Sequence, residues 1–398
     1  MSADRFNFLE FGEDVGAESS PAELFRAPVP REIYAETLSD GTALAEVRIV
    51  DPRGFRGGQE AGEEGAVTLS SLAGQAGQGP TKLRVTEVFG ERGVKAGQFL
   101  YPTGLAVDTT GILFVADVQN HRVQRITPGG GVAVVGGRGV GRGQFASPQG
   151  IATDEEDSFF VVEEGNHRVQ KFTREGVLTL LFGRQGRGAG ELQGPTAIAV
   201  APGSGDIFVA DTGNSRVQRF DYQGRFLSVI GAPGDHYPSL SSPQALAVDA
   251  GGCLSVADTF AQRLLRYDPL GRLDRQIGGA AGRSPKMRGI AGNGTAPIVF
   301  HQPRALAADP SGLLYVADGG LPDALTGEMR GRIQCLTLPD GPCLAAVEKA
   351  GRGLGTLLRP GGLAVGPSTD AGSRGGLPRG DLYVADTLNH RILRFIWS

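Results

Sequence analysis

The feature that most constrains this chain is a sequence unit that recurs six times between residue 97 and the end. Each copy contains an apolar stretch that ends in an acidic residue, such as LFVAD, and an arginine-containing stretch that follows shortly after, such as RVQRI. The first four acidic residues lie 46, 48 and 47 residues apart, and insertions lengthen the last two intervals to 60 and 68 residues. A period of this size is typical of solenoids and propellers.

Each unit divides into four short apolar segments separated by Gly, Pro or Asp. In the first unit these segments, called strands a to d here, are GLAVD, LFVAD, RVQRI and GVAVVGG. They are rich in the β-branched and aromatic residues that favour strands, and the residues between them favour turns. The sequence therefore predicts an all-β chain, a six-bladed β-propeller of four-stranded blades.

The two ends of the repeated region predict how the ring closes. The last unit stops after its third strand, whereas residues 83–89, LRVTEVF, form an orphan strand of the d type before the first unit. Every blade has four strands if residues 83–89 pair with the C-terminal blade. Such pairing removes two exposed sheet edges, which are sites of edge-to-edge aggregation.

Residues 1–80 differ in character from residues 81–398. They contain no repeat, are rich in Gly, Ala and Glu, and carry a net charge of −8 against +4 for the remainder. A segment of this composition buries too little apolar surface to offset the entropy lost on ordering. We expect a mostly disordered acidic tail, with one strand at 44–50, followed by a propeller domain over 81–398.

The repeated pattern GQFxxPxGLAVD…LFVADxxNHRVQRI resembles the NHL-repeat family, named for its Asn-His-Leu motif. The resemblance extends over residues 81–398 and implies a six-bladed propeller. Departures are few: Glu163 replaces the usual Asp, Ala261 and Gln262 replace Asn-His, and the fifth unit has an insertion at the motif. A WD40 propeller is disfavoured because the chain has a single tryptophan, Trp397.

The acid that ends strand b and the arginine that begins strand c flank a tight turn in every unit. A buried ion pair in each blade is the expected consequence. The predicted pairs are Asp117 with Arg122, Glu163 with Arg168, Asp211 with Arg216, Asp258 with Arg263, Asp318 with Arg332 and Asp386 with Arg391.

Other repeated residues also favour structural roles. His121, His167 and His390 occupy a position where other units carry Ser or Gln, so we expect hydrogen-bonding turn residues and no metal ligands. Phe99 and Phe145 of the GQF element are expected to pack between blades.

A catalytic site would be expected where strand a begins, because propeller enzymes place their ligands around the central channel. The residues that follow each repeat proline include neither a carboxylate nor an imidazole: Thr103, Gln149, Thr196, Gln244, Arg304 and Gly361. The three cysteines also lack metal-ligand spacing. The sequence thus predicts no catalytic residue, no metal and no cofactor, and a channel-centred lyase or hydrolase is the weakest alternative.

The loops between blades favour a binding function. The d–a and b–c connections share one face of the disc and are mostly basic, whereas the opposite face is mostly acidic. Long loops on a rigid scaffold often carry function, and the two longest insertions in blade five flank the channel on the basic face. The predicted binding residues are Arg283, Lys286, Met287, Arg288, Arg304 and Arg330.

The main functional prediction is therefore a monomeric, non-catalytic scaffold that binds a protein or another anionic partner on this basic face. Single-stranded RNA on the same face is one alternative. A ubiquitin-ligase-associated substrate adaptor without its own RING is another. We expect a cytoplasmic protein without a membrane segment, since neither a signal peptide nor an apolar run of spanning length is evident.

Overall fold

The computed structural model describes residues 83–231, 239–279, 298–319, 331–338, 343–347, 356–368 and 380–397, with 343–347 described by its backbone alone. The tail 1–80, including the strand predicted at 44–50, lies outside the described residues.

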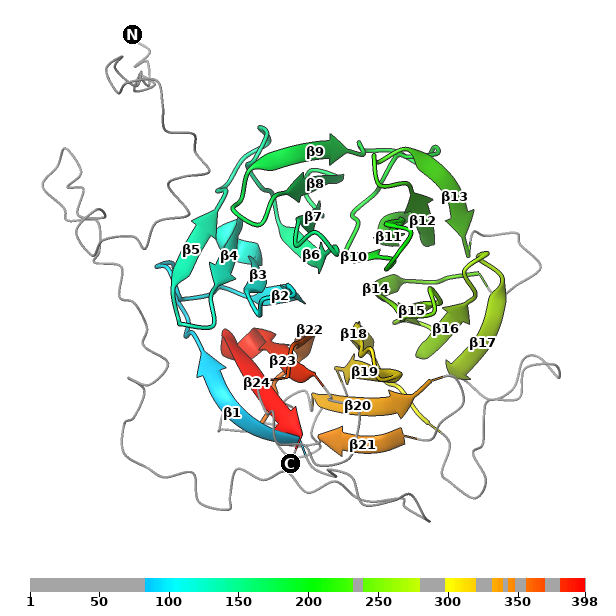
Figure 1. Cartoon of the computed structure of the whole chain (residues 1–398). Coiled ribbons are helices and arrows are strands. Elements are labelled where there is room, and N and C mark those ends of the chain that lie inside the picture. Colours follow the sequence, from blue (N-terminus) through cyan, green and yellow to red (C-terminus); the bar gives the residue numbers. More distant parts are fainter. Residues whose placement is uncertain are drawn as a thin grey trace, which may run out of the picture. The chain divides into compact units, whose positions relative to one another are not determined.

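Six antiparallel sheets of four strands each are arranged in a ring around a common axis (Figure 1). This confirms the predicted six-bladed, all-β propeller. The first three blades, each given from the axis outward, are β2 (Pro102–Val107), β3 (Leu113–Asp117), β4 (Arg122–Ile126) and β5 (Val132–Val135); β6 (Pro148–Thr153), β7 (Phe159–Glu163), β8 (Arg168–Phe172) and β9 (Leu178–Phe182); and β10 (Ala197–Val200), β11 (Ile207–Asp211), β12 (Arg216–Phe220) and β13 (Phe226–Ile230).

The other three blades repeat this order. They are β14 (Pro243–Val248), β15 (Leu254–Asp258), β16 (Arg263–Tyr267) and β17 (Leu273–Gly278); β18 (Pro303–Ala308), β19 (Leu313–Asp318), β20 (Arg332–Thr337) and β21 (Cys343–Val347); and β22 (Pro360–Gly366), β23 (Asp381–Asp386), β24 (Arg391–Trp397) and β1 (Leu83–Phe89). Single 3₁₀ turns follow β3, β11 and β23.

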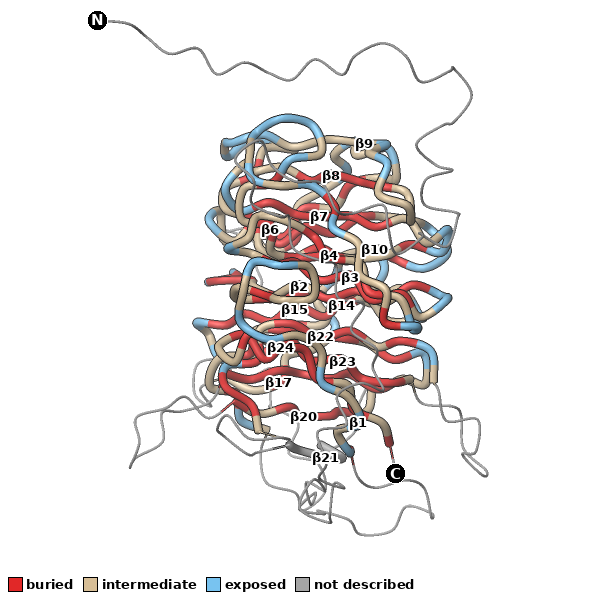
Figure 2. Tube along the Cα trace, turned by 90° about the vertical axis from the view of Figure 1, so that its left-hand side faces the viewer, coloured by how far each residue is buried: buried red, intermediate tan, exposed pale blue. Residues whose placement is uncertain are grey.

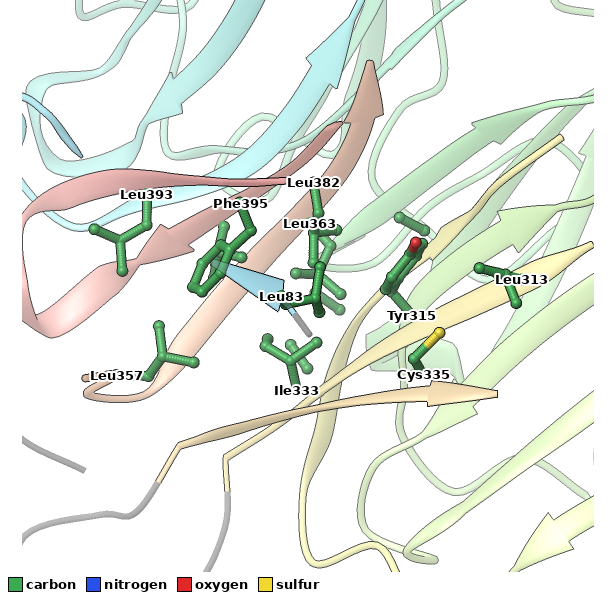
Figure 3. Packing of buried hydrophobic residues seen from close by; sticks show 14 of the residues in the cluster. Leu83, Leu313, Tyr315, Ile333, Cys335, Leu357, Leu363, Leu382, Leu393 and Phe395 are labelled. Carbon is green, nitrogen blue, oxygen red and sulfur yellow. The ribbon is translucent and has the colours of Figure 1, made fainter. Parts of the chain in front are cut away.

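The ring closes as the sequence predicted. Strand β1 pairs antiparallel with β24, from Leu83 opposite Trp397 to Phe89 opposite Ile392. Leu83 is 1% exposed and packs in a cluster that joins blade six to Tyr315 of blade five (Figure 3). The indole Nε1 of Trp397 donates a hydrogen bond of 2.8 Å to the Tyr315 hydroxyl. Closure therefore buries apolar surface as well as pairing the last sheet edge.

The core lies between adjacent blades. Figure 2 shows buried residues along the strands and exposed residues concentrated in the connecting loops. Phe99 packs with Leu105 of blade one and Ile392 of blade six, and Phe145 packs with Val123 and other residues of blades one and two. Both phenylalanines are fully buried, which confirms their predicted packing role.

All six predicted ion pairs form, with N–O distances between 2.5 and 2.9 Å and fully buried carboxylates. Blade three illustrates the arrangement. Asp211 Oδ1 accepts a hydrogen bond from the Gln193 backbone N–H, while Oδ2 accepts from Asn214, Arg216 and Gln218. One buried carboxylate thus ties the loop that enters a blade to the turn between its second and third strands.

The motif histidines lie in turns, as predicted, and their hydrogen bonds join consecutive blades. Nδ1 of His121 accepts from the Ser147 N–H at 3.0 Å, and Nδ1 of His390 accepts from the Tyr101 N–H at 3.1 Å. Burial, with a smaller contribution from Arg138, lowers the pKa of His121. A lowered pKa favours the neutral imidazole, whose bare nitrogen can accept these bonds.

Candidate functional site

A pocket of about 430 Å³ lies where the innermost strands of the six blades begin. These strands surround the axis of the ring in Figure 1. Residues at the start of strand a and residues just after strand b line the pocket together. Its polar lining consists of Tyr101, Thr103, Gln119, Gln149, Glu164, Thr196, Gln244, Arg304, Arg359 and Thr387.

The backbones of neighbouring inner strands approach each other closely around the pocket. A Cβ atom on Gly104 would lie 2.2 Å from the Gln149 carbonyl oxygen, and one on Gly362 would lie 1.7 Å from the Thr103 carbonyl oxygen. A side chain at either position would force adjacent strands apart, which explains the requirement for glycine there.

Threonine hydroxyls form hydrogen bonds between adjacent blades. The Thr103 hydroxyl donates to the Gln149 carbonyl at 2.9 Å, and the Thr387 hydroxyl donates to the Pro102 carbonyl at 2.8 Å. These donors are used inside the protein. The glutamine amides and the charged side chains therefore remain as the principal groups that can contact a molecule in the pocket.

The pocket contains a carboxylate that the sequence analysis missed. Glu164 directly follows the buried Glu163 of β7, lies exposed in the pocket lining, and accepts a 2.6 Å hydrogen bond from Gln149 Nε2. The six residues after the repeat prolines do lack a carboxylate, but the residue after strand b also reaches the channel. The other units have Val118, Thr or Gly at this position, so its departure from the repeat was the available signal.

Arg304 begins the inner strand of blade five and reaches the same pocket. Its NH2 donates to Gln302 Oε1 at 2.8 Å and its NH1 to Gln244 Oε1 at 3.3 Å, and its buried Nε has no hydrogen-bond acceptor among the described residues. Burial lowers the pKa of Arg304, the like charge of Arg359 lowers it further, and the more distant carboxylate of Asp318 offsets part of this effect. The pocket therefore holds a guanidinium that forms no ion pair with any carboxylate of the described residues.

The two charges stand on opposite sides of the ring. Glu164 comes from blade two and Arg304 from blade five, which lie three blades apart (Figure 1). A bound molecule would meet negative charge at one side of the pocket and positive charge at the other.

Of the predicted binding residues, the structure describes only Arg304 and places it in the channel pocket. Arg283, Lys286, Met287, Arg288 and Arg330 lie outside the described residues. The predicted cluster and its protein or RNA partners are therefore untested by the structure.

Two further observations concern the described residues alone. No group of three or more His, Cys, Asp or Glu side chains lies close enough together there to hold a metal ion. In this part of the chain, no helix combines the length and the apolar character required to cross a membrane.

The sequence matches the NHL repeat over residues 99–126, 145–172 and 192–220. These segments coincide with the first three copies of the unit, from the GQF element or its equivalent to the end of strand c. The chain therefore carries NHL repeats, and its fold is the six-bladed β-propeller that the resemblance implied. The sequence matches no curated protein.

Several solved structures are similar to this chain at low sequence identity. A gluconolactonase from Xanthomonas campestris is 17% identical, with a TM-score of 0.53, and the match covers 84% of this chain and 94% of that one. A protein of unknown function from Bacteroides thetaiotaomicron is 17% identical, with a TM-score of 0.55, over 79% of this chain and 75% of that one. A virginiamycin B lyase from Staphylococcus aureus is 14% identical, with a TM-score of 0.47, over 76% and 81%.

These comparisons correct the main functional prediction. The gluconolactonase that shares the fold is an enzyme, so a non-catalytic scaffold acting through its basic face is not the function that the findings favour. They favour the channel-centred alternative, which the sequence analysis had ranked last. At these identities the likeness shows the fold alone, and the expectation that the chain is not an enzyme is untested by it.

Proposed function

We propose that the chain is a channel-centred hydrolase that cleaves a small ester or lactone. The observation that carries the proposal is the exposed Glu164 carboxylate in the pocket at the end of the channel. The gluconolactonase that shares the fold supports a lactone as the substrate class. The proposal replaces the expectation of a non-enzyme, which rested on the six residues after the repeat prolines.

The chemistry requires a base and a source of hydrogen-bond donors. Glu164 takes a proton from a water molecule, and the water oxygen adds to the carbonyl carbon of the substrate. The amides of Gln119 and Gln149 line the pocket on blades one and two, and they donate to the carbonyl oxygen as it gains negative charge. The carbon–oxygen bond to the leaving alcohol then breaks, and that alcohol recovers the proton from Glu164.

The pocket can be tested by filling it. The full chain is mixed with glucono-δ-lactone or p-nitrophenyl acetate, and product formation is followed above the spontaneous rate. Gln244 lines the pocket, so Gln244→Trp is expected to displace the substrate and to lower turnover about 100-fold.

The matched control is Gln223→Trp, which places the same side chain in an exposed turn after β12. This variant should retain full turnover. The proposal fails if the wild-type chain accelerates neither reaction, or if Gln244→Trp hydrolyses the substrate as fast as the wild type.

A further inference from the structure

Two half-buried arginines of the described chain, Arg266 and Arg394, have carboxylate partners, whereas the Nε of the half-buried Arg125 has no hydrogen-bond partner among the described residues. Arg266 pairs with Asp249 and Arg394 pairs with Asp381, each at 2.6 Å. Arg304 differs, because its hydrogen-bond acceptors are the neutral amides of Gln302 and Gln244. No carboxylate among the described residues lies within ion-pair distance of Arg304.

A second cation lies beside it in the same pocket. Arg359 precedes β22 of blade six, lines the pocket and is exposed. Its charge acts unfavourably on Arg304. Two like charges in one pocket, one of them half-buried, are costly unless a negative charge joins them.

The remaining donors fit such a charge. A guanidinium carries more N–H donors than the two glutamine oxygens use, and its planar fork pairs with carboxylate or phosphate oxygens. The opposite wall carries Glu164, which repels an anion. An anionic ligand is therefore oriented with its charged group toward Arg304 and its uncharged end toward Glu164.

We propose that the pocket takes a small organic anion whose carboxylate or phosphate group pairs with Arg304 and Arg359, across the channel from Glu164. The role of this anion as a substrate rests on the proposed hydrolase, whereas its binding depends only on Arg304 and Arg359. The inference assigns Arg304 as a substrate-positioning residue, which places the bond to be cleaved beside the base.

Calorimetric titration of the full chain tests the inference with three probes that share one polyol chain. Gluconate supplies the carboxylate, glucitol phosphate supplies the phosphate, and glucitol carries no charge. At least one anion should bind, and glucitol should bind about 10- to 100-fold more weakly, which corresponds to the loss of charge-assisted hydrogen bonds. The stronger anion identifies the charged group.

Variants assign the binding to the pocket. Arg304→Gln is expected to weaken the anion about 10- to 100-fold, and Arg304→Lys, which keeps the charge without the fork, should fall between. Arg225→Gln removes an arginine that is 77% exposed in the turn between β12 and β13, and it should bind as the wild type does. The melting temperature of Arg304→Gln should not fall, because the variant removes an uncompensated charge.

Binding and turnover separate the two proposals. If neither anion binds, if glucitol binds equally well, or if Arg304→Gln binds the anion unchanged, the anion inference is overturned while hydrolysis of an uncharged ester can still be observed. If an anion binds through Arg304 but no ester or lactone is hydrolysed, the inference stands and the proposed hydrolase is overturned.

Discussion

Asp211→Ala is expected to lower the free energy of unfolding by about 3–5 kcal/mol. The substitution removes the acceptor of four hydrogen bonds and leaves Arg216, whose side chain is only 12% exposed, without its counter-charge. Arg216 also donates to the Gly188 and Glu191 carbonyls. The loop that enters blade three should therefore loosen together with the turn after β11.

Denaturant unfolding followed by circular dichroism measures this change. Asp274→Ala is the control, because Asp274 is 38% exposed and its partner Arg266 keeps a second carboxylate, Asp249. The control should lie within about 1 kcal/mol of the wild type. Equal stability losses in both variants would show that burial of the Asp211 carboxylate has no special importance for the blade.

Glu164→Gln is expected to lower kcat for the hydrolysed lactone or ester by about 10²- to 10⁴-fold. The substitution keeps the size of the side chain and its ability to accept a hydrogen bond from Gln149, but it removes the base. Because Glu164 is exposed, folding stability should change little. Steady-state kinetics of proton release provide the measurement.

The chain offers a closely matched control for this variant. Glu91 is also exposed and also accepts a hydrogen bond from a glutamine amide, that of Gln98 at 2.9 Å, but it lies outside the pocket lining. Glu91→Gln should retain wild-type kcat. Full activity of Glu164→Gln would show that Glu164 is not the general base, even if the chain hydrolyses the substrate.

The repeated parts of the fold were predictable because they depend on local sequence. Each acid–arginine pair flanks one turn within a single unit, with a spacing of five residues in five units and fourteen in the fifth, so six copies make the pattern clear despite exceptions such as Glu163. The pairing of β1 with β24 was predictable for a different reason. A missing strand at one end of the repeat and an extra one at the other leave a single way to complete every blade.

The channel pocket was harder to predict because six separate units converge on it. In the sequence analysis the b–c connections belong to one face as a group, and the ring brings Glu164 of one such connection to the pocket beside Gln149. Arg304 was selected for its charge and for its place at the channel mouth. The guanidinium of Arg304 has the neutral amides of Gln302 and Gln244 as hydrogen-bond acceptors and lies near the like charge of Arg359. No spacing in the sequence reveals that arrangement.

Counting charges on loops also misdirected the functional prediction. An excess of basic residues on surface loops is compatible with many functions, because exposed charges are well solvated and have little effect on stability. The geometry at the axis is more restrictive, since only the ends of the inner strands and the residues after strand b can line it. Departures from the repeat at these positions are therefore the more informative signal in a propeller sequence.

Residues 83–89 complete the last blade of the ring, and a disulfide can test that pairing directly. Arg84 lies opposite Ile396 in the β1–β24 register. Side chains at opposed positions are near enough for a disulfide to form. Mild oxidation of the full chain carrying Arg84→Cys and Ile396→Cys should link the two positions, as detected by mass spectrometry of the digested protein. A chain with Arg84→Cys and Leu227→Cys, the latter on β13 of blade three, should remain unlinked. Absence of the 84–396 link, or equal linkage in the second chain, would contradict the closed ring.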